Sequence, residues 1–179
     1  MNMEINPSEY KILIVDDVMS NVLLLKVLLT NEKFAIATAN NGRQALEQVD
    51  KEHPDLVLLD VMMPDLSGFE VAQRLKSNPD TADIPIIFLT ALNSTTDIVK
   101  GFQAGASDFI SKPFNKEELI IRVTHQVSLV AAKRIILNKT EELQRIIAGR
   151  DKLYSVIAHD LRSPMGSIKM VLNLSLIHI

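Results

Sequence analysis

The sequence predicts an α/β protein: a five-stranded parallel sheet, doubly wound with helices on both faces, followed by a long α-helical extension. Two observations support this prediction. Short apolar segments rich in β-branched residues alternate five times with segments of helical spacing between residues 11 and 125. Each parallel connection needs a helix to cross over the sheet, so this alternation indicates a doubly wound architecture. After Asn115 no further strand pattern follows, and apolar residues recur at helical spacing.

The predicted strands are short apolar runs, and the first of them ends in an acidic pair. We expect strands at residues 11–15, 34–39, 55–59, 84–89 and 107–110. The helices expected between them are residues 21–29, 42–51, 67–76 and 95–104, and helix resumes after Pro113. Continuous apolar runs such as 55–59 are typical of parallel strands that are buried on both faces.

Length and composition narrow the class of protein. The chain has 179 residues, a net charge of -3 and a pI near 5.8. This length suits one ordinary domain with an additional segment, and the charge does not favour nucleic-acid binding. The chain has no cysteine, which excludes disulfides and thiolate metal sites. Residues 1–10 form a polar tail without a signal-peptide layout, and no apolar run is long enough to span a membrane, so we expect a soluble, cytoplasmic protein.

Polar side chains gather at the predicted carboxyl ends of the strands. Asp16 and Asp17 follow the first strand, Asp60 the third, Thr90 the fourth and Lys112 the fifth. Open parallel sheets bind ligands at this edge. Clustered carboxylates suit a hard divalent cation, and Mg²⁺ is the usual one beside phosphate. A lysine and a hydroxyl group can hold phosphoryl oxygens, so the set predicts phosphoryl transfer by positioning and charge neutralisation.

These residues lie within longer characteristic strings. The strings are Ile14-Val15-Asp16-Asp17, Leu59-Asp60-Val61-Met62-Met63-Pro64-Asp65, Gly68, Leu89-Thr90-Ala91 and Gly105-Ala106-Ser107-Asp108-Phe109-Ile110-Ser111-Lys112-Pro113-Phe114. With them, residues 11–125 resemble the receiver domain of two-component response regulators, which has a flavodoxin-like strand order. Taken singly, the acidic pair could be a helix cap and the lysine a surface residue; the joint pattern favours the receiver.

The resemblance implies a role for each acidic residue. Asp60 is implied as the nucleophile that forms an aspartyl phosphate. Asp17 is implied to bind Mg²⁺ directly and Asp16 through water, while Asp60 and the backbone carbonyl of Met62 complete the protein ligands.

The resemblance also implies roles around the acceptor. Lys112 is implied to pair with Asp60 and then with the phosphoryl oxygens. Thr90 is implied to move towards the phosphoryl group, and Phe109 to follow it inward as a switch aromatic; judged alone, Phe109 would be a core residue. Pro113 is implied to follow a cis peptide bond.

The helical extension carries a stripe of apolar residues. Ile136, Leu143, Ile146, Leu153 and Ile157 are separated by steps of seven, three, seven and four, which is typical of a seam for a partner helix. We therefore predict a signalling helix of the coiled-coil type over residues 126–150, which forms a parallel homodimer.

A second chemical pattern lies in residues 151–173. His159 is offset from the apolar stripe and is followed by Asp160, so an exposed nucleophile with a neighbouring base is indicated. The string His159-Asp160-Leu161-Arg162-Ser163-Pro164 resembles the H-box of histidine kinases, which implies a partial phosphoacceptor helix with His159 as its phosphohistidine. The alternative is a surface histidine on an amphipathic helix.

These patterns leave three functions open. The first is a truncated hybrid histidine kinase, which needs an ATP-binding domain that these residues do not contain. The second is a non-enzymatic response regulator that acts by helix-mediated dimerisation. The third is a histidine phosphotransfer protein without an ATP-binding domain. Each implies a phosphodonor kinase or phosphotransfer domain as partner. Residues 174–179 match one reading frame of a sequencing adaptor, so we expect the natural protein to continue differently after Asn173; a genuine apolar helix end is the alternative.

Overall fold

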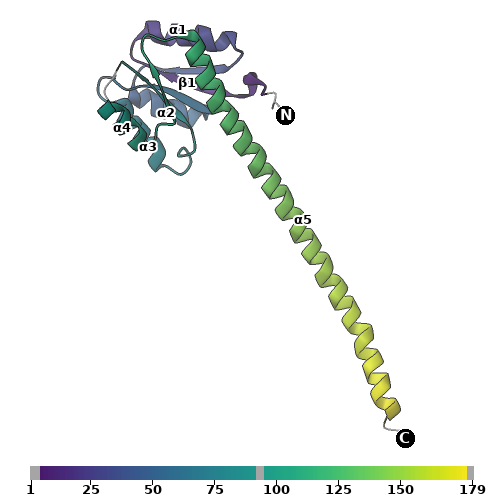
Figure 1. Ribbon diagram of the computed structural model, residues 1–179. Coiled ribbons are helices and arrows are strands. Elements are labelled where there is room, and N and C mark those ends of the chain that lie inside the picture. Colours follow the sequence, from purple (N-terminus) through teal and green to yellow (C-terminus); the bar gives the residue numbers. More distant parts are fainter. Residues whose placement is uncertain (1–4, 92–94, 177–179) are drawn as a thin grey trace. The chain divides into compact units, whose positions relative to one another are not determined.

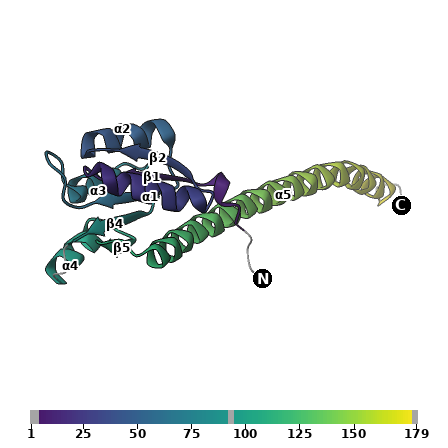
Figure 2. The ribbon, with the colours of Figure 1, turned by 90° about the horizontal axis from the view of Figure 1, so that it is seen from above.

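The structure is a computed structural model that describes residues 5–91 and 95–176; for residues 95–98 and 161–176 it describes the backbone alone. One five-stranded parallel sheet has the order β2-β1-β3-β4-β5, and Figure 2 labels β1, β2, β4 and β5. The strands are β1 (Lys11–Val15), β2 (Ala35–Ala39), β3 (Leu56–Asp60), β4 (Ile86–Thr90) and β5 (Asp108–Ser111). The helices are α1 (Met19–Asn31), α2 (Gly42–Glu52), α3 (Gly68–Ser77), α4 (Thr95–Gln103) and α5 (Lys116–Leu176), and a 3-10 helix, η1, spans Pro7–Glu9 (Figure 1).

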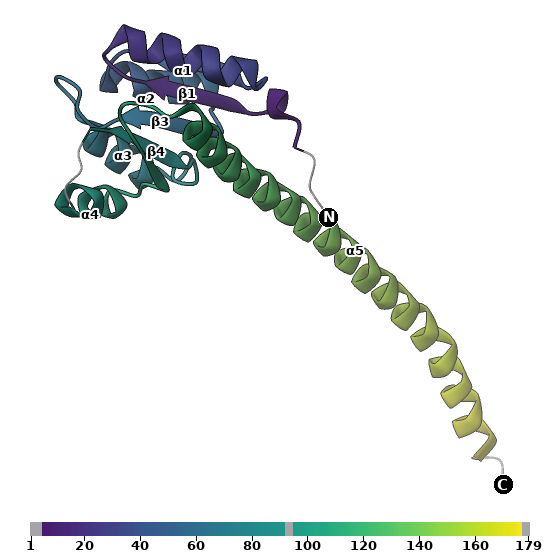
Figure 3. The same cartoon turned by 45° about the horizontal axis from the view of Figure 1, so that its top comes forward.

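The sheet is covered on both faces, as predicted (Figure 3). Side chains of α1 and of the first part of α5 pack with one set of strand residues, including Ile12 and Ile14. Side chains of α2 and α3, together with Ala104 just after α4, pack with the alternate set, including Leu13 and Val15. Every residue of β3 and β4 is buried, because each of these strands has helices on both sides. The predicted fold class, with its flavodoxin-like strand order, is confirmed.

The element boundaries differ from the prediction by a few residues. Helix α1 begins at Met19, two residues earlier than expected, because its apolar residues surround the helix and give no clear periodicity. The unpredicted η1 follows Asn6, whose side chain accepts a hydrogen bond from the backbone of Ser8. Tyr10 is buried, so the described end of the polar tail joins the core of the sheet.

The chain divides into two compact units, Met1–Ala131 and Ala132–Ile179. The first holds the sheet, and the second is the continuation of α5, whose backbone stays helical through Gly149 and Pro164. Within the parts of the chain that the structure describes, no helix is long and apolar enough to cross a membrane. Of the expected adaptor-derived residues, 177–179 lie outside the described part.

Candidate functional site

The carboxyl ends of β1 and β3 lie next to each other at the centre of the sheet. Val15 pairs with Leu59, so the residues that follow them, Asp16 and Asp60, are neighbours. The strand order turns outward in opposite directions from these two strands, which makes this the edge where doubly wound sheets bind ligands.

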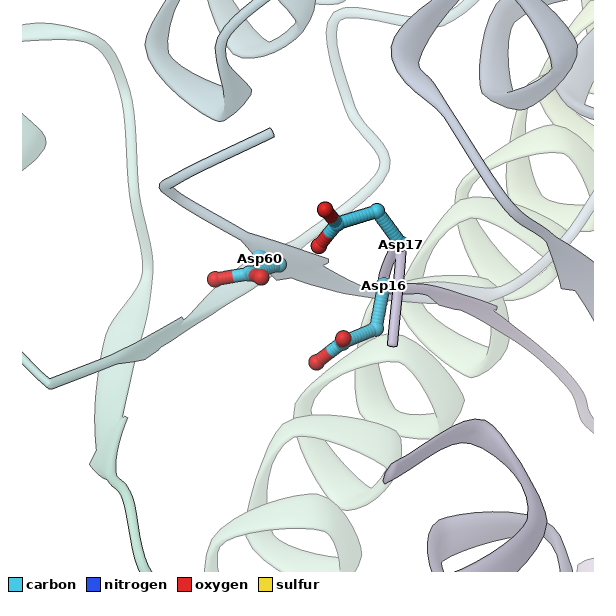
Figure 4. A group of neighbouring side chains, drawn as sticks. All are labelled: Asp16, Asp17 and Asp60. Carbon is cyan, nitrogen blue, oxygen red and sulfur yellow. The ribbon is translucent and has the colours of Figure 1, made fainter. Parts of the chain in front are cut away.

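Three carboxylates meet at this edge. Asp16, Asp17 and Asp60 each offer an oxygen atom, and these atoms lie within 4.8 Å of one another. Figure 4 shows the side chains of Asp16 and Asp17 extending from the end of β1 towards the side where Asp60 lies. Asp16 is fully buried and Asp60 is 4% exposed, whereas Asp17 is open to solvent. The predicted acidic cluster is therefore brought together, with one member at the surface.

Lys112 joins the cluster from the end of β5. Its ammonium group lies 2.7 Å from Oδ2 of Asp16 and 2.9 Å from Oδ2 of Asp60. Its backbone N–H donates to the carbonyl of Thr90 at 2.8 Å, which ties the residue to the end of β4. The peptide bond between Lys112 and Pro113 is cis, as the resemblance implies.

The carboxylate of Asp16 is held by more than the lysine. The backbone N–H of Val18 donates to its Oδ1 at 2.9 Å. The side-chain amide of Asn21 donates to both of its oxygens at 3.1 Å. The sequence pattern did not predict a role for Asn21, although its position in the first turn of the helix after the acidic pair could have indicated one. These contacts fix Asp16, so its oxygens are occupied by hydrogen bonds within the protein.

Burial and charge act in opposite directions on the ionisation of the site. Burial raises the pKa of Asp60, and the charge of Asp16 adds to this, while the hydrogen bond and charge of Lys112 offset it only in part. Burial alone would lower the pKa of Lys112, but its hydrogen bonds and ion pairs with Asp16 and Asp60 outweigh burial and raise it. Three carboxylates thus face one ammonium group, and an oxygen-rich site with excess negative charge fits a hard divalent cation.

The other predicted residues lie on β4 and β5 or just after β3. Thr90 is the last residue of β4 and is 7% exposed. The backbone N–H of Met62 donates to Oδ1 of Asp60 at 3.3 Å, while its side chain is exposed. Phe109 is partly buried on β5, beside the ring of Phe88.

Gly68 lies against the backbone of Asp60. It is the first residue of α3, and a Cβ there would lie 2.2 Å from the carbonyl oxygen of Asp60 and 3.0 Å from Cα of Val61. The N–H of Gly68 donates to the carbonyl of Val61 at 3.0 Å. The backbone of α3 therefore touches the backbone that carries Asp60, which only a residue without a side chain allows.

His159 and Asp160 are neighbours in the second unit and are not members of the carboxylate cluster. Nδ1 of His159 lies 3.4 Å from Oδ1 of Asp160, and the two side chains are 86% and 74% exposed. The side chains of the remaining H-box residues, 161–164, lie outside the described part of the chain.

Comparison with known proteins gives consistent similarities. Residues 12–124 match the response regulator receiver domain family. The response regulator PleD of Caulobacter vibrioides is 42% identical over 140 residues, which cover 78% of this chain and 30% of that protein. The chain spans less than half the length of this and the other curated relatives that it matches here.

Two solved structures are similar to the sheet-bearing part. The signal receiver domain of a signal transduction histidine kinase from Syntrophus aciditrophicus is 35% identical with a TM-score of 0.63, covering 66% of this chain and 90% of that one. The chemotaxis protein CheY4 of Vibrio cholerae is 31% identical with a TM-score of 0.63, covering 65% of this chain and 97% of that one.

Proposed function

The chain belongs to the response regulator receiver domain family of two-component phosphorelay signalling, and from that premise we propose that Asp60 accepts a phosphoryl group in the presence of Mg²⁺. The observation that carries this proposal is the joint position of Asp60 and Lys112 within the carboxylate cluster. A carboxylate oxygen of Asp60 attacks phosphorus in line, the bond to the donor's leaving group breaks, and an aspartyl phosphate remains.

The neighbouring residues have complementary roles in this proposal. Asp17 is exposed and binds the cation directly, together with Asp60 and the carbonyl of Met62. Asp16 is already held by backbone, amide and ammonium donors, so it acts through water. When bound, Mg²⁺ supplies positive charge that offsets the charge on the phosphoryl oxygens.

In this proposal Thr90 of β4 and Lys112, directly after β5, bind the phosphoryl oxygens, and Phe109 of β5 responds to phosphorylation. Lys112 already contacts the acceptor carboxylate, and its ammonium group can pair with a phosphoryl oxygen once Asp60 is modified. Thr90 donates its hydroxyl to another phosphoryl oxygen, and Phe109 moves with it as the switch aromatic. The phosphodonor is a histidine kinase or a phosphotransfer domain.

Replacing Asp17 with asparagine should weaken Mg²⁺ binding at least tenfold, because the variant removes one negative charge from the cluster that holds the cation. Binding can be measured by calorimetric titration of the full chain. Asp50→Asn is the matched control, since it makes the same change on the exposed surface of α2. Equal Mg²⁺ affinity in the two variants would contradict the assignment of Asp17.

We propose further that residues 151–173 are part of a kinase phosphoacceptor helix, in a hybrid histidine kinase. The exposed His159 beside the carboxylate of Asp160 supports this proposal. So does the similarity of the sheet to a receiver domain that comes from a histidine kinase. In this arrangement His159 is the phosphohistidine and Asp160 the assisting base.

His159 should become labelled when the ATP-binding domain of a hybrid histidine kinase and labelled ATP are supplied to the full chain. The label should be stable in base and labile in acid, whereas an aspartyl phosphate is labile in base. His159→Gln should lose the base-stable label, and His125→Gln, which changes another exposed histidine of α5, should keep it. Base-stable label that persists in His159→Gln would contradict the proposal and would leave His159 as a surface histidine of an amphipathic helix.

We also propose that the second unit forms a parallel helical homodimer. The seam residues are Ile136, Leu143, Ile146, Leu153 and Ile157, and each is between 43% and 64% exposed in the single chain. Their heptad-like spacing presents one continuous stripe on a helix whose backbone is unbroken. In this proposal the signalling helix of residues 126–150 connects the receiver to the phosphoacceptor segment.

Ile146→Glu should weaken this dimer by more than about 100-fold, because two apolar side chains per dimer lose burial worth about 1.5–3 kcal/mol each. Sedimentation equilibrium of the full chain measures the change. Gln144→Glu introduces the same side chain at an exposed position outside the seam and should leave the dimer intact. A monomeric wild-type chain at micromolar concentration would contradict the proposal.

A further inference from the structure

Gly101 lies inside α4, directly against an aromatic ring. A Cβ at this position would lie 2.4 Å from Cζ and 2.6 Å from Cε1 of Phe109, and 3.3 Å from Cδ2 of Phe88. Gly101 itself is buried. The tip of the Phe109 ring therefore occupies the space that a side chain at 101 would take.

The Phe109 ring is a link in a row of aromatic rings. Phe88 pairs with Phe109 in the strand register, and their ring centroids are 5.7 Å apart. On the far side, Phe102 of α4 meets Phe109 edge to face at 4.8 Å. Phe88 is fully buried, whereas Phe102 is 54% exposed, so the row runs from the core to the surface of α4.

A glycine inside a helix weakens the helix unless something else requires it. Gly149, a glycine inside α5, shows the contrast, since a Cβ there would meet nothing within 4 Å. At Gly101 the requirement is visible as the ring of Phe109. A methyl group at 101 would therefore require the Phe109 ring to shift from this position.

We propose that Gly101 is a positioning residue: because it has no side chain, the ring of Phe109 can lie against α4. In this position the Phe109 ring transmits the phosphorylation state of Asp60 to the exposed ring of Phe102. The transmitting role rests on the proposed function of Asp60 and Phe109. The packing of the Phe109 ring against Gly101, called the seat below, does not depend on that proposed function.

The first test follows the ring itself. The chain has six phenylalanines and no tryptophan, so uniform labelling with 4-fluorophenylalanine gives six fluorine resonances. The Phe109 and Phe102 lines are identified by their loss in Phe109→Leu and in Phe102→Leu. In Gly101→Ala the Phe109 resonance should shift by more than its line width, because the label sits on Cζ, the atom nearest the new methyl group. Gly149→Ala is the matched control and should leave that line in place. An unmoved Phe109 line in Gly101→Ala would overturn the seat.

The second test concerns transmission. Beryllofluoride with Mg²⁺, a stable mimic of the aspartyl phosphate, should shift the Phe109 and Phe102 lines of the wild-type chain. In Gly101→Ala the response of the Phe102 line should fall to less than half, while Mg²⁺ affinity measured by calorimetry stays unchanged. A full Phe102 response in the variant overturns the transmitting role. A wild-type chain in which no line responds overturns the proposed function instead, and the seat is still decided by the first test.

A stability cycle keeps the inference testable if Gly101→Ala folds poorly. With Phe109 present, alanine at 101 should lower the thermal midpoint because the ring is displaced. In the Phe109→Ala background the same change should raise it or leave it unaltered, because the ring is gone and alanine favours the helix. Equal loss in both backgrounds would show that the cost does not come from Phe109, and would overturn the proposal.

Discussion

Asp60→Asn is expected to abolish phosphoryl incorporation from acetyl phosphate and Mg²⁺, where the wild-type chain should gain one group. The amide of asparagine has nearly the shape of the carboxylate but is not a nucleophile at neutral pH. Incorporation can be measured by intact-protein mass spectrometry. Asp65→Asn is the matched control, since Asp65 follows on the same loop with a φ of 69°, a conformation that asparagine also adopts readily.

Stability separates lost chemistry from lost fold in this experiment. Burial raises the pKa of Asp60, so the ionised carboxylate opposes folding at neutral pH, and acidification towards the folded-state pKa should relieve this. Asp60→Asn should therefore unfold at the same temperature as the wild type or higher. Incorporation that persists in this well-folded variant would show that another residue is the acceptor.

Gly68→Ala should destabilise the receiver by about 1–3 kcal/mol, the usual cost of forcing an extra methyl group into a packed site. The atoms that the new Cβ would meet belong to the backbone of Asp60 and Val61, and a backbone cannot step aside as a flexible side chain can. Urea denaturation followed by circular dichroism measures the loss. Phosphoryl incorporation should fall as well, because relief of the clash displaces the acceptor.

Gly149→Ala gives the comparison for this variant. It makes the same chemical change in a helix where the Cβ meets nothing within 4 Å, so it should stabilise by about 0.5–1 kcal/mol. An unchanged urea midpoint in Gly68→Ala would mean that α3 and the Asp60 backbone can separate without cost.

Strands β1, β3 and β4 could be predicted because their buried residues form continuous apolar segments of the sequence. β3 and β4 are buried along their whole length, so they appear as unbroken apolar runs. Helix α1 carries a weaker mark, since apolar residues such as Leu23 and Val27 remain exposed beside the buried Leu25. The sequence therefore predicts the first turn of α1 two residues after its observed start at Met19.

The acidic cluster could be predicted because strand ends are fixed by topology alone. Any parallel sheet of this order brings the residues after β1 and β3 together. The contacts of Asn21 and Gly101 depend instead on how a helix is rotated and how closely it approaches the sheet. A single sequence gives periodicity but not the distance between a helix and the sheet, so the contacts of Asn21 and Gly101 could be found only in the structure.

The ion pair between Lys112 and Asp16 has a consequence for folding. It joins residues 96 positions apart in the sequence. Bringing such distant segments together costs loop-closure entropy, and the packing of the intervening strands and helices must offset this cost. A chain still being synthesised has no complete cluster of carboxylates and lysine until β5 and the lysine after it have been made. If Asp60 is the acceptor as proposed, the chain can be phosphorylated only after the whole sheet has assembled.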